Sequence, residues 1–115
     1  MNNIGNPDLI QHLFDLSARC DKEIQNYAKF GEQYAQAEHD YQVAKSQTAL
    51  TLEANGKTST MIGHILKGHT GVATLMLKRD IAKSKYEVSK EKINLLKLQI
   101  RIVDGQISRE WGRNE

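Results

Sequence analysis

One short motif in the chain resembles the end of a phosphate-binding loop. Gly56-Lys57-Thr58 matches the last three residues of the motif Gly-x-x-x-x-Gly-Lys-Thr. That motif needs a further glycine where this chain has Thr51, and it follows a β-strand, whereas the residues before Gly56 have helical periodicity. We therefore interpret the segment as the end of one helix followed by the N-cap of the next.

The histidines and the single cysteine do not form a metal-binding or catalytic pattern. A zinc site usually takes four ligands in closely spaced pairs, and the four histidines lack that spacing. Cys20 falls on an apolar helix position, which is typical of a small buried residue. The adjacent Glu38, His39 and Asp40 diverge by about 100° per residue on a helix, so they do not converge on one substrate. The sequence predicts a non-enzymatic protein without a metal or another cofactor.

Charge is distributed unevenly between the two halves of the chain. Residues 1–57 contain five Lys or Arg and eight Asp or Glu, whereas residues 58–115 contain eleven and six. Opposite charges favour the pairing of antiparallel helices, and a basic half could also contact phosphates independently of sequence. The candidate nucleic-acid-binding residues are Lys57, His64, Lys67, His69, Lys78, Arg79, Arg109, Trp111 and Arg113.

Aromatic residues have two interpretations. Trp111 lies between Arg109 and Arg113 and could stack on bases, or it could cover the end of an apolar core, which we favour. Tyrosines seven residues apart in the first half could also stack on bases. Their regular spacing beside small residues is more typical of packing between helices.

The elements that position these residues are predicted to include two long helices. Asn6-Pro7-Asp8 is a helix start with Asn6 as the N-cap. Apolar residues then recur with heptad spacing, interrupted by Glu23, which predicts a helix over residues 7–54. One column of this seam is Leu13, Cys20, Tyr27, Tyr34 and Tyr41, and the other is Leu9, Leu16, Phe30, Ala37 and Ala44.

Glycines and hydroxyl residues divide the rest of the chain. Gly56 is expected in the left-handed conformation that ends the first helix. A short helix follows in the tip, residues 55–70, and ends at Gly68, and Thr70 is expected to cap a second long helix over about 71–110. The chain is therefore predicted to be a single all-α domain of residues 1–115, an antiparallel hairpin of two coiled-coil-like helices with a short helix at its tip.

The second long helix is apolar on two sides. The side expected to pair with the first helix carries Val72, Tyr86, Ile93, Ile100 and Ile107. The other side carries Ile81, Val88, Leu95 and Ile102. Because one partner helix covers only one side, this second stripe predicts a homo-oligomer, a dimer or higher, with a core of four or more helices.

Membrane and leader signals are weak in this sequence. No apolar run reaches the roughly 18 residues that span a membrane, and the first residues lack a basic segment followed by an apolar one. We expect an unprocessed intracellular protein that does not contact a membrane.

Spaced residues in the last two thirds of the chain resemble a known group of proteins. They are Tyr34-x2-Ala37-x3-Tyr41-x2-Ala44-Lys45, Leu50-x-Leu52-x3-Gly56-Lys57, Lys67-Gly68-x3-Val72-Ala73, Arg79-Asp80-x-Ala82-x3-Tyr86 and Arg101-x4-Gln106-Ile107-x-Arg109-Glu110-Trp111. Over residues 34–111 the chain resembles small, mostly uncharacterised helical proteins of temperate phages and prophages of Gram-positive bacteria, from early regions near recombination and replication genes. The resemblance brings no catalytic residues. It implies an accessory protein that acts by binding in the cytoplasm of a bacterial host.

Two functions are consistent with these features. The first is a nucleic-acid-binding factor of phage recombination or replication, whose partner is DNA or a recombination or replication protein. The alternative is a protein-interaction inhibitor of a host defence system, for example an anti-CRISPR protein, that acts through an oligomeric helical surface. The basic second half supports the first function, and the second apolar stripe supports the alternative. A purely structural coiled coil is a third, weaker interpretation.

Overall fold

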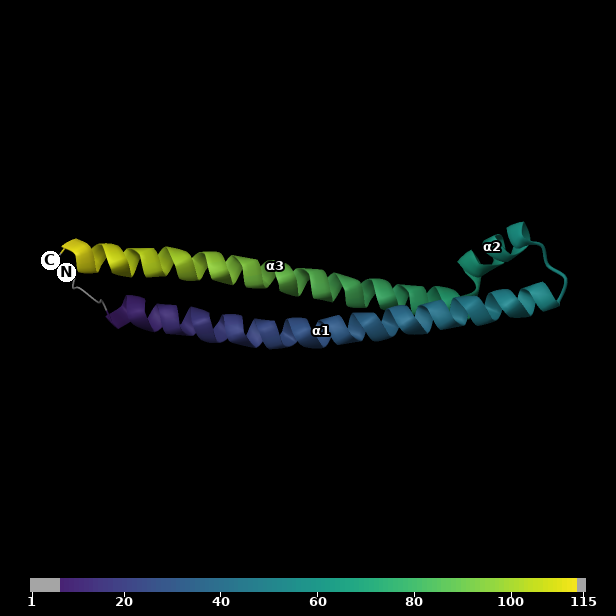
Figure 1. Cartoon of the computed structure of the whole chain (residues 1–115), viewed down its shortest axis with the longest axis horizontal. Coiled ribbons are helices and arrows are strands. Elements are labelled where there is room, and N and C mark those ends of the chain that lie inside the picture. Colours follow the sequence, from purple (N-terminus) through teal and green to yellow (C-terminus); the bar gives the residue numbers. More distant parts are fainter. Residues whose placement is uncertain (1–6, 114–115) are drawn as a thin grey trace. The chain divides into compact units, whose positions relative to one another are not determined.

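The computed structural model describes residues 7–113 and contains three α-helices in this range (Figure 1). They are α1 (Pro7–Ala54), α2 (Ser59–Gly68) and α3 (Thr70–Arg113). No strand is present among these residues. The predicted all-α class is confirmed, with α1 at its predicted bounds and α3 ending three residues beyond position 110. The proposed N-cap Asn6 lies outside the described residues.

The C-terminus of α1 is closed by the glycine that the sequence indicated. Gly56 has a φ angle of +84°, a left-handed conformation in which a residue with a side chain would be strained. Its amide donates to the carbonyl of Glu53 over 3.0 Å, and the amide of Lys57 donates to the carbonyl of Leu52 over 3.1 Å. These two bonds form a Schellman motif. Gly56-Lys57-Thr58 is therefore a pair of helix caps, as predicted.

Side chains cap the N-termini of α2 and α3. The hydroxyl of Thr58 accepts a 3.3 Å bond from the amide of Met61. His69 caps α3, because its carbonyl accepts the first helical bond, from Ala73, and its Nδ1 accepts a 3.2 Å bond from the amide of Val72. The prediction that Thr70 caps this helix is wrong by one residue. An imidazole nitrogen replaces the more usual hydroxyl or carboxylate acceptor.

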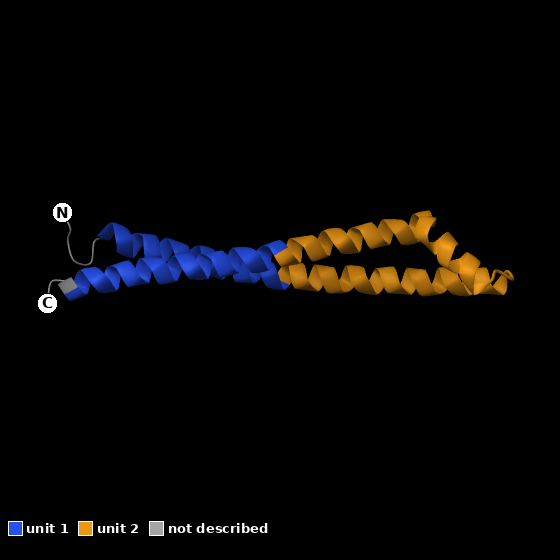
Figure 2. Ribbon diagram, turned by 90° about the horizontal axis from the view of Figure 1, so that it is seen from above, with its two compact units in different colours: residues 1–28, 88–115 blue, residues 29–87 orange. Residues whose placement is uncertain are grey.

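The chain divides into two compact units, and α1 and α3 contribute to both (Figure 2). Unit 1 comprises residues 1–28 and 88–115, and unit 2 comprises residues 29–87. In each unit a segment of α1 lies beside a segment of α3 and runs antiparallel to it (Figure 2). The predicted antiparallel pairing of the long helices is therefore present in both units.

Unit 1 has an apolar core along the predicted seam. Its buried residues are Leu16, Cys20, Ile93, Leu96 and Val103, with Leu9, Leu13, Tyr27, Ile100 and Ile107 packed against them. The interruption of the seam at Glu23 has a partner on α3. Ser89 is 1% exposed, and its hydroxyl donates a 2.5 Å bond to the Glu23 carboxylate. A polar residue on each helix thus fills a seam position without leaving a buried group unsatisfied.

Unit 2 combines the remaining parts of the long helices with α2. Ala37, Tyr41 and Val72 are buried there. The rings of Tyr34 and Tyr86 lie 6.0 Å apart, an ordinary distance for an aromatic pair. Tyrosines of the α1 seam therefore pack within the protein, as predicted.

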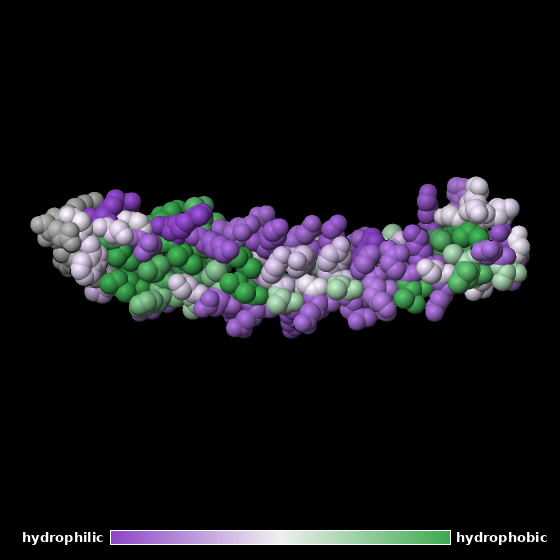
Figure 3. Space-filling model, in the orientation of Figure 1, coloured by the Kyte–Doolittle hydropathy of each residue, from purple (hydrophilic) through white to green (hydrophobic). Residues whose placement is uncertain are grey.

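The second apolar stripe of α3 is exposed. In unit 1, Val88, Leu95 and Ile102 are 51%, 55% and 54% exposed, and Ile81 in unit 2 is 49% exposed. The space-filling view shows apolar side chains gathered on the surface of unit 1 as well as over α2 (Figure 3). Across residues 7–113, no helix has both the length and the apolar character that crossing a membrane requires.

Candidate nucleic-acid interface

One part of unit 2, which we call the basic end, has an excess of lysines. It comprises residues 41–78, the last turns of α1, all of α2 and the first turns of α3. Its charged residues are Lys45, Lys57, Lys67, Lys78 and Glu53. All five side chains belong to exposed residues. The same range contains serines and threonines, so the basic end combines cations with neutral donors, as phosphate-binding surfaces do.

The lysines of the basic end form no ion pair with another described residue. In contrast, three neighbouring carboxylates of unit 2 each accept a hydrogen bond from another side chain. They are Glu38, Asp40 and Asp80. The surface charge of the basic end is therefore positive, beyond what the small net charge of the chain suggests.

Hydrogen bonds hold two of these carboxylates in the charged form. Donors from Gln42 and Arg79 lower the pKa of Glu38 below its ordinary value of 4.5. The His39 ring and the Gln36 amide lower the pKa of Asp40 below its ordinary value of 3.8, and Lys78 contributes through its charge. Both groups therefore stay ionised at neutral pH. Arg79 carries a charge that compensates that of Glu38, whereas Gln36 and Gln42 are neutral donors.

Arg79 belongs to the packing of unit 2. Its guanidinium lies 4.5 Å from the centre of the Tyr41 ring. It also forms ion pairs of 3.1 Å with Glu38 and 2.9 Å with Asp80, which raise the pKa of Arg79. Its side chain is 23% exposed. A phosphate would have to compete with two carboxylates for these donors, so we omit Arg79 from the proposed contacts.

The two histidines of the basic end have different surroundings. His64 lies exposed on α2. His69 is also exposed, but its Nδ1 caps α3, which leaves Nε2 as the nitrogen that could reach a ligand. The sequence analysis named both as candidate nucleic-acid-binding residues and did not identify the capping role of His69.

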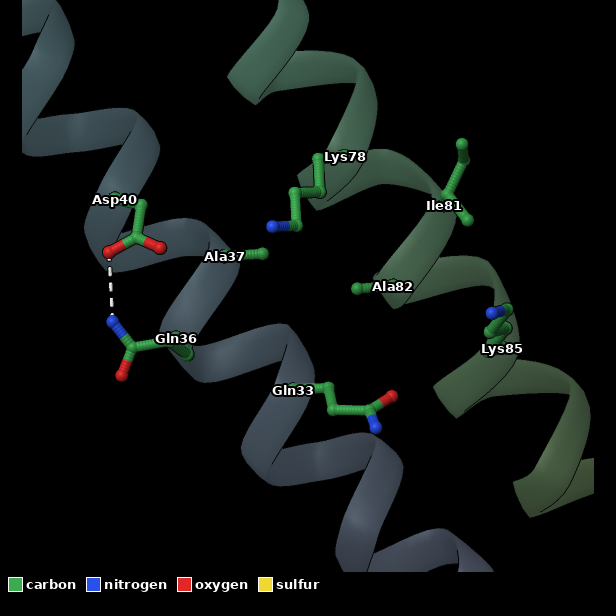
Figure 4. Close-up of a pocket in the computed structure, with 8 residues that line it drawn as sticks. All are labelled: Gln33, Gln36, Ala37, Asp40, Lys78, Ile81, Ala82 and Lys85. Carbon is green, nitrogen blue, oxygen red and sulfur yellow. Dashed lines mark hydrogen bonds between the residues drawn. The ribbon is translucent and has the colours of Figure 1, made fainter.

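Lys78 borders a groove on the flank of unit 2 (Figure 4). The groove has a volume of about 400 Å³ and is lined by Gln33, Gln36, Ala37, Asp40, Lys78, Ile81, Ala82 and Lys85. The small side chains of Ala37 and Ala82 face each other across it, and the Lys78 amine points into it from α3 (Figure 4). The groove thus presents the amine of Lys78, a donor for phosphate oxygens, while the Gln36 amide in its lining donates to the Asp40 carboxylate.

The remaining candidates lie in unit 1, at the end of α3. Arg109 is exposed and Trp111 is 53% exposed. Arg113 ends the helix, and its side chain is not among the described ones. Because these residues belong to the other unit, they form a separate candidate surface.

Lys45 belongs to the basic end and was not among the predicted residues. Its amine lies 5.7 Å from the centre of the Tyr41 ring, one helical turn earlier on α1. The signal was present in the sequence, because residues four apart on a helix are neighbours. It was missed because the α1 half of the chain is acidic overall.

Metal ligands do not gather in the described part of the chain, where no three His, Cys, Asp or Glu side chains could hold one ion. No protein-family model, curated protein or solved structure matches the chain. Its function is therefore inferred from the surfaces described above.

Proposed function

We propose that this chain is a non-enzymatic, phage-type accessory protein that binds nucleic acid through the basic end of unit 2. The proposal rests on one observation, the four lysines of that end without an ion pair in the described chain. Lysines contact phosphates as point charges, and phosphate contacts carry no sequence information. The expected binding is therefore independent of sequence and sensitive to salt.

Neutralising lysines of the basic end tests this function. We would replace Lys57, Lys67 and Lys78 together by Gln and titrate fluorescently labelled single- and double-stranded DNA by anisotropy. Each lost phosphate contact removes counterion release, so we expect affinity to fall at least about tenfold and the log–log salt slope to shrink by up to about three.

A matched control removes the same charge from unit 1. Lys90, Lys92 and Lys97 are exposed residues of α3 and lie outside the basic end. Replacing these three by Gln should change the affinity by less than about threefold, an effect of long-range charge alone. Equal losses in the two triple variants would show that net charge, and not the basic end, determines binding.

A second property is supported by the exposed stripe of α3. Val88, Leu95 and Ile102 are each about half exposed in unit 1, and they recur every seven residues along one helix. A heptad stripe of aliphatic residues is the usual surface for packing against another helix. We propose that it holds copies of the chain together, so that several basic ends bind one nucleic acid with increased avidity.

Light scattering tests the assembly. Leu95→Asp combined with Ile102→Asp places charges on the stripe and should lower the solution mass, whereas Leu50→Asp, at a more exposed apolar position of unit 2, should not. An unchanged mass in the double variant would refute the assembly face. If the wild-type chain is a monomer that does not bind DNA, the exposed stripe instead supports the alternative function, inhibition of a host defence protein.

A further inference from the structure

A second groove lies in unit 2, where all three helices meet. It has a volume of about 400 Å³ and is lined by Tyr41 and Lys45 of α1, Gly63, Leu66 and Lys67 of α2, and Val72, Ala73 and Met76 of α3. This volume is in the range of small-molecule sites. The groove is separate from the flank groove of Figure 4, because the two share no lining residue.

The lining has two chemical parts. Leu66, Val72 and Met76 provide aliphatic surface, and Ala73 keeps the space open. The only charged residues of the lining are Lys45 and Lys67. Neither forms an ion pair among the described residues. A ligand that complements this lining has an aliphatic body and an anionic head group.

The position of α2 leaves apolar surface in the groove that such a ligand would cover. This helix has no buried residue, and its Leu66 lines the groove with Lys67 beside it in the last turn. Apolar atoms of Leu66 and Met76 that now face solvent would be covered by an aliphatic chain. Covering apolar surface is the general driving force for such binding.

The geometry points to this groove as a binding site for one anionic amphiphile, an aliphatic chain that ends in a carboxylate or a similar anion. The chain lies along Leu66, Val72 and Met76, and the anion is bound by Lys45 and Lys67. Both lysines are long and flexible, so they reach a head group at the mouth of the groove without a change in the helices. This assignment does not require nucleic-acid binding, although Lys45 and Lys67 belong to both proposed surfaces.

Methionine methyl groups provide a local readout of the groove. The chain has three methionines, of which Met76 lines the groove and Met61 lies exposed on α2 outside it. We would label methionine methyl groups with ¹³C and titrate the full chain with decanoate below its micelle concentration. The Met76 signal should shift and saturate, whereas the Met61 signal should stay constant.

The role of charge in ligand binding is tested with a cationic ligand and with lysine variants. Decylammonium has the same chain and the opposite charge, and it should not saturate the Met76 signal. Lys45→Gln with Lys67→Gln should weaken decanoate binding about tenfold, whereas Lys57→Gln, which removes a lysine of the basic end outside the groove, should change it less than about twofold.

Three results would overturn the assignment. They are a joint, unsaturating shift of Met61 and Met76, equal binding of decylammonium, and an equal loss in the Lys57→Gln chain. All the lysine substitutions are at exposed positions, and circular dichroism verifies that each variant is folded.

Discussion

Replacement of Arg79 by Ala is the most informative test of how unit 2 is held together. The guanidinium lies 4.5 Å from the centre of the Tyr41 ring and 3.1 Å from Glu38. Both partners lie on α1, whereas Arg79 lies on α3. The contacts therefore join two helices across the seam and are absent from the unfolded chain. The bond to Asp80 is local and is expected to contribute little to the free energy of unfolding.

The expected cost follows from these two contacts. A partly desolvated cation–π contact contributes about 1 kcal/mol, and a partly exposed surface ion pair contributes about 0.5 kcal/mol. We expect Arg79→Ala to lower the free energy of unfolding by about 1.5 kcal/mol, which in a chain of this size lowers the Tm by about 5–10 °C. Arg79→Lys should retain only part of this stabilisation, because an ammonium lacks the planar surface that stacks on a ring.

Urea unfolding followed by circular dichroism measures this effect, at one protein concentration so that any self-association is constant. Lys83→Ala is the control, since Lys83 is exposed on the same helix and forms no ion pair in residues 7–113. A double-mutant cycle with Tyr41→Leu should give a coupling of about 1 kcal/mol. A cost for Arg79→Ala within about 0.5 kcal/mol of that for Lys83→Ala would refute the reasoning.

Three further changes have defined outcomes. Gly31→Ala should gain less stability than Gly105→Ala, measured by urea unfolding, because a Cβ at Gly31 would lie 3.1 Å from the Tyr86 ring, whereas at Gly105 it meets only a flexible arginine at 3.5 Å; an equal gain would contradict the close contact. His69→Ala should cost about 1 kcal/mol through loss of the α3 cap, and His69→Asn should restore most of it; equal costs would show that the imidazole does not cap the helix. The hydrogen bonds that lower the pKa of Glu38 stabilise the fold at neutral pH, and this contribution is lost as the pH falls below about 4.5. Glu38→Gln should therefore lose less stability than the wild type on acidification. Parallel profiles of unfolding free energy against pH would contradict this prediction.

Helix bounds and caps were accessible from the sequence because their signals are local. Pro7 fits only the first turn of a helix, and a left-handed residue after a helix is usually glycine, as at Gly56. The N-cap Thr58 could be predicted from the same kind of local signal. The N-cap His69 could not, since histidine is a rare N-cap and the hydroxyl of Thr70 was the more usual acceptor.

Contacts between the helices were less accessible. The heptad spacing identified which residues form the seam, but not which residue of one helix faces which residue of the other. Glu23 interrupted the pattern, and only the pairing of the helices shows that Ser89 of α3 binds its carboxylate. Arg79 looked like a surface cation for the same reason.

The candidate site shows the same division. Three of the four lysines of the basic end were predicted from the sequence, whereas the absence of ion pairs at these lysines in the described structure depends on where Glu38, Asp40 and Asp80 find donors. The amphiphile groove depends on how α2 lies against α1 and α3. No short motif encodes that placement.

The central claim, that the lysines of the basic end bind phosphates, is tested most directly by the salt dependence of DNA binding. Anisotropy titrations would use single- and double-stranded DNA at several salt concentrations and protein of known solution mass. If four lysines contact phosphates, the plot of log affinity against log salt concentration should fall with a slope no steeper than about −3.6 per chain for duplex and about −2.8 for a single strand. No binding at low salt, with protein well above the micromolar range of non-specific complexes, would contradict the account.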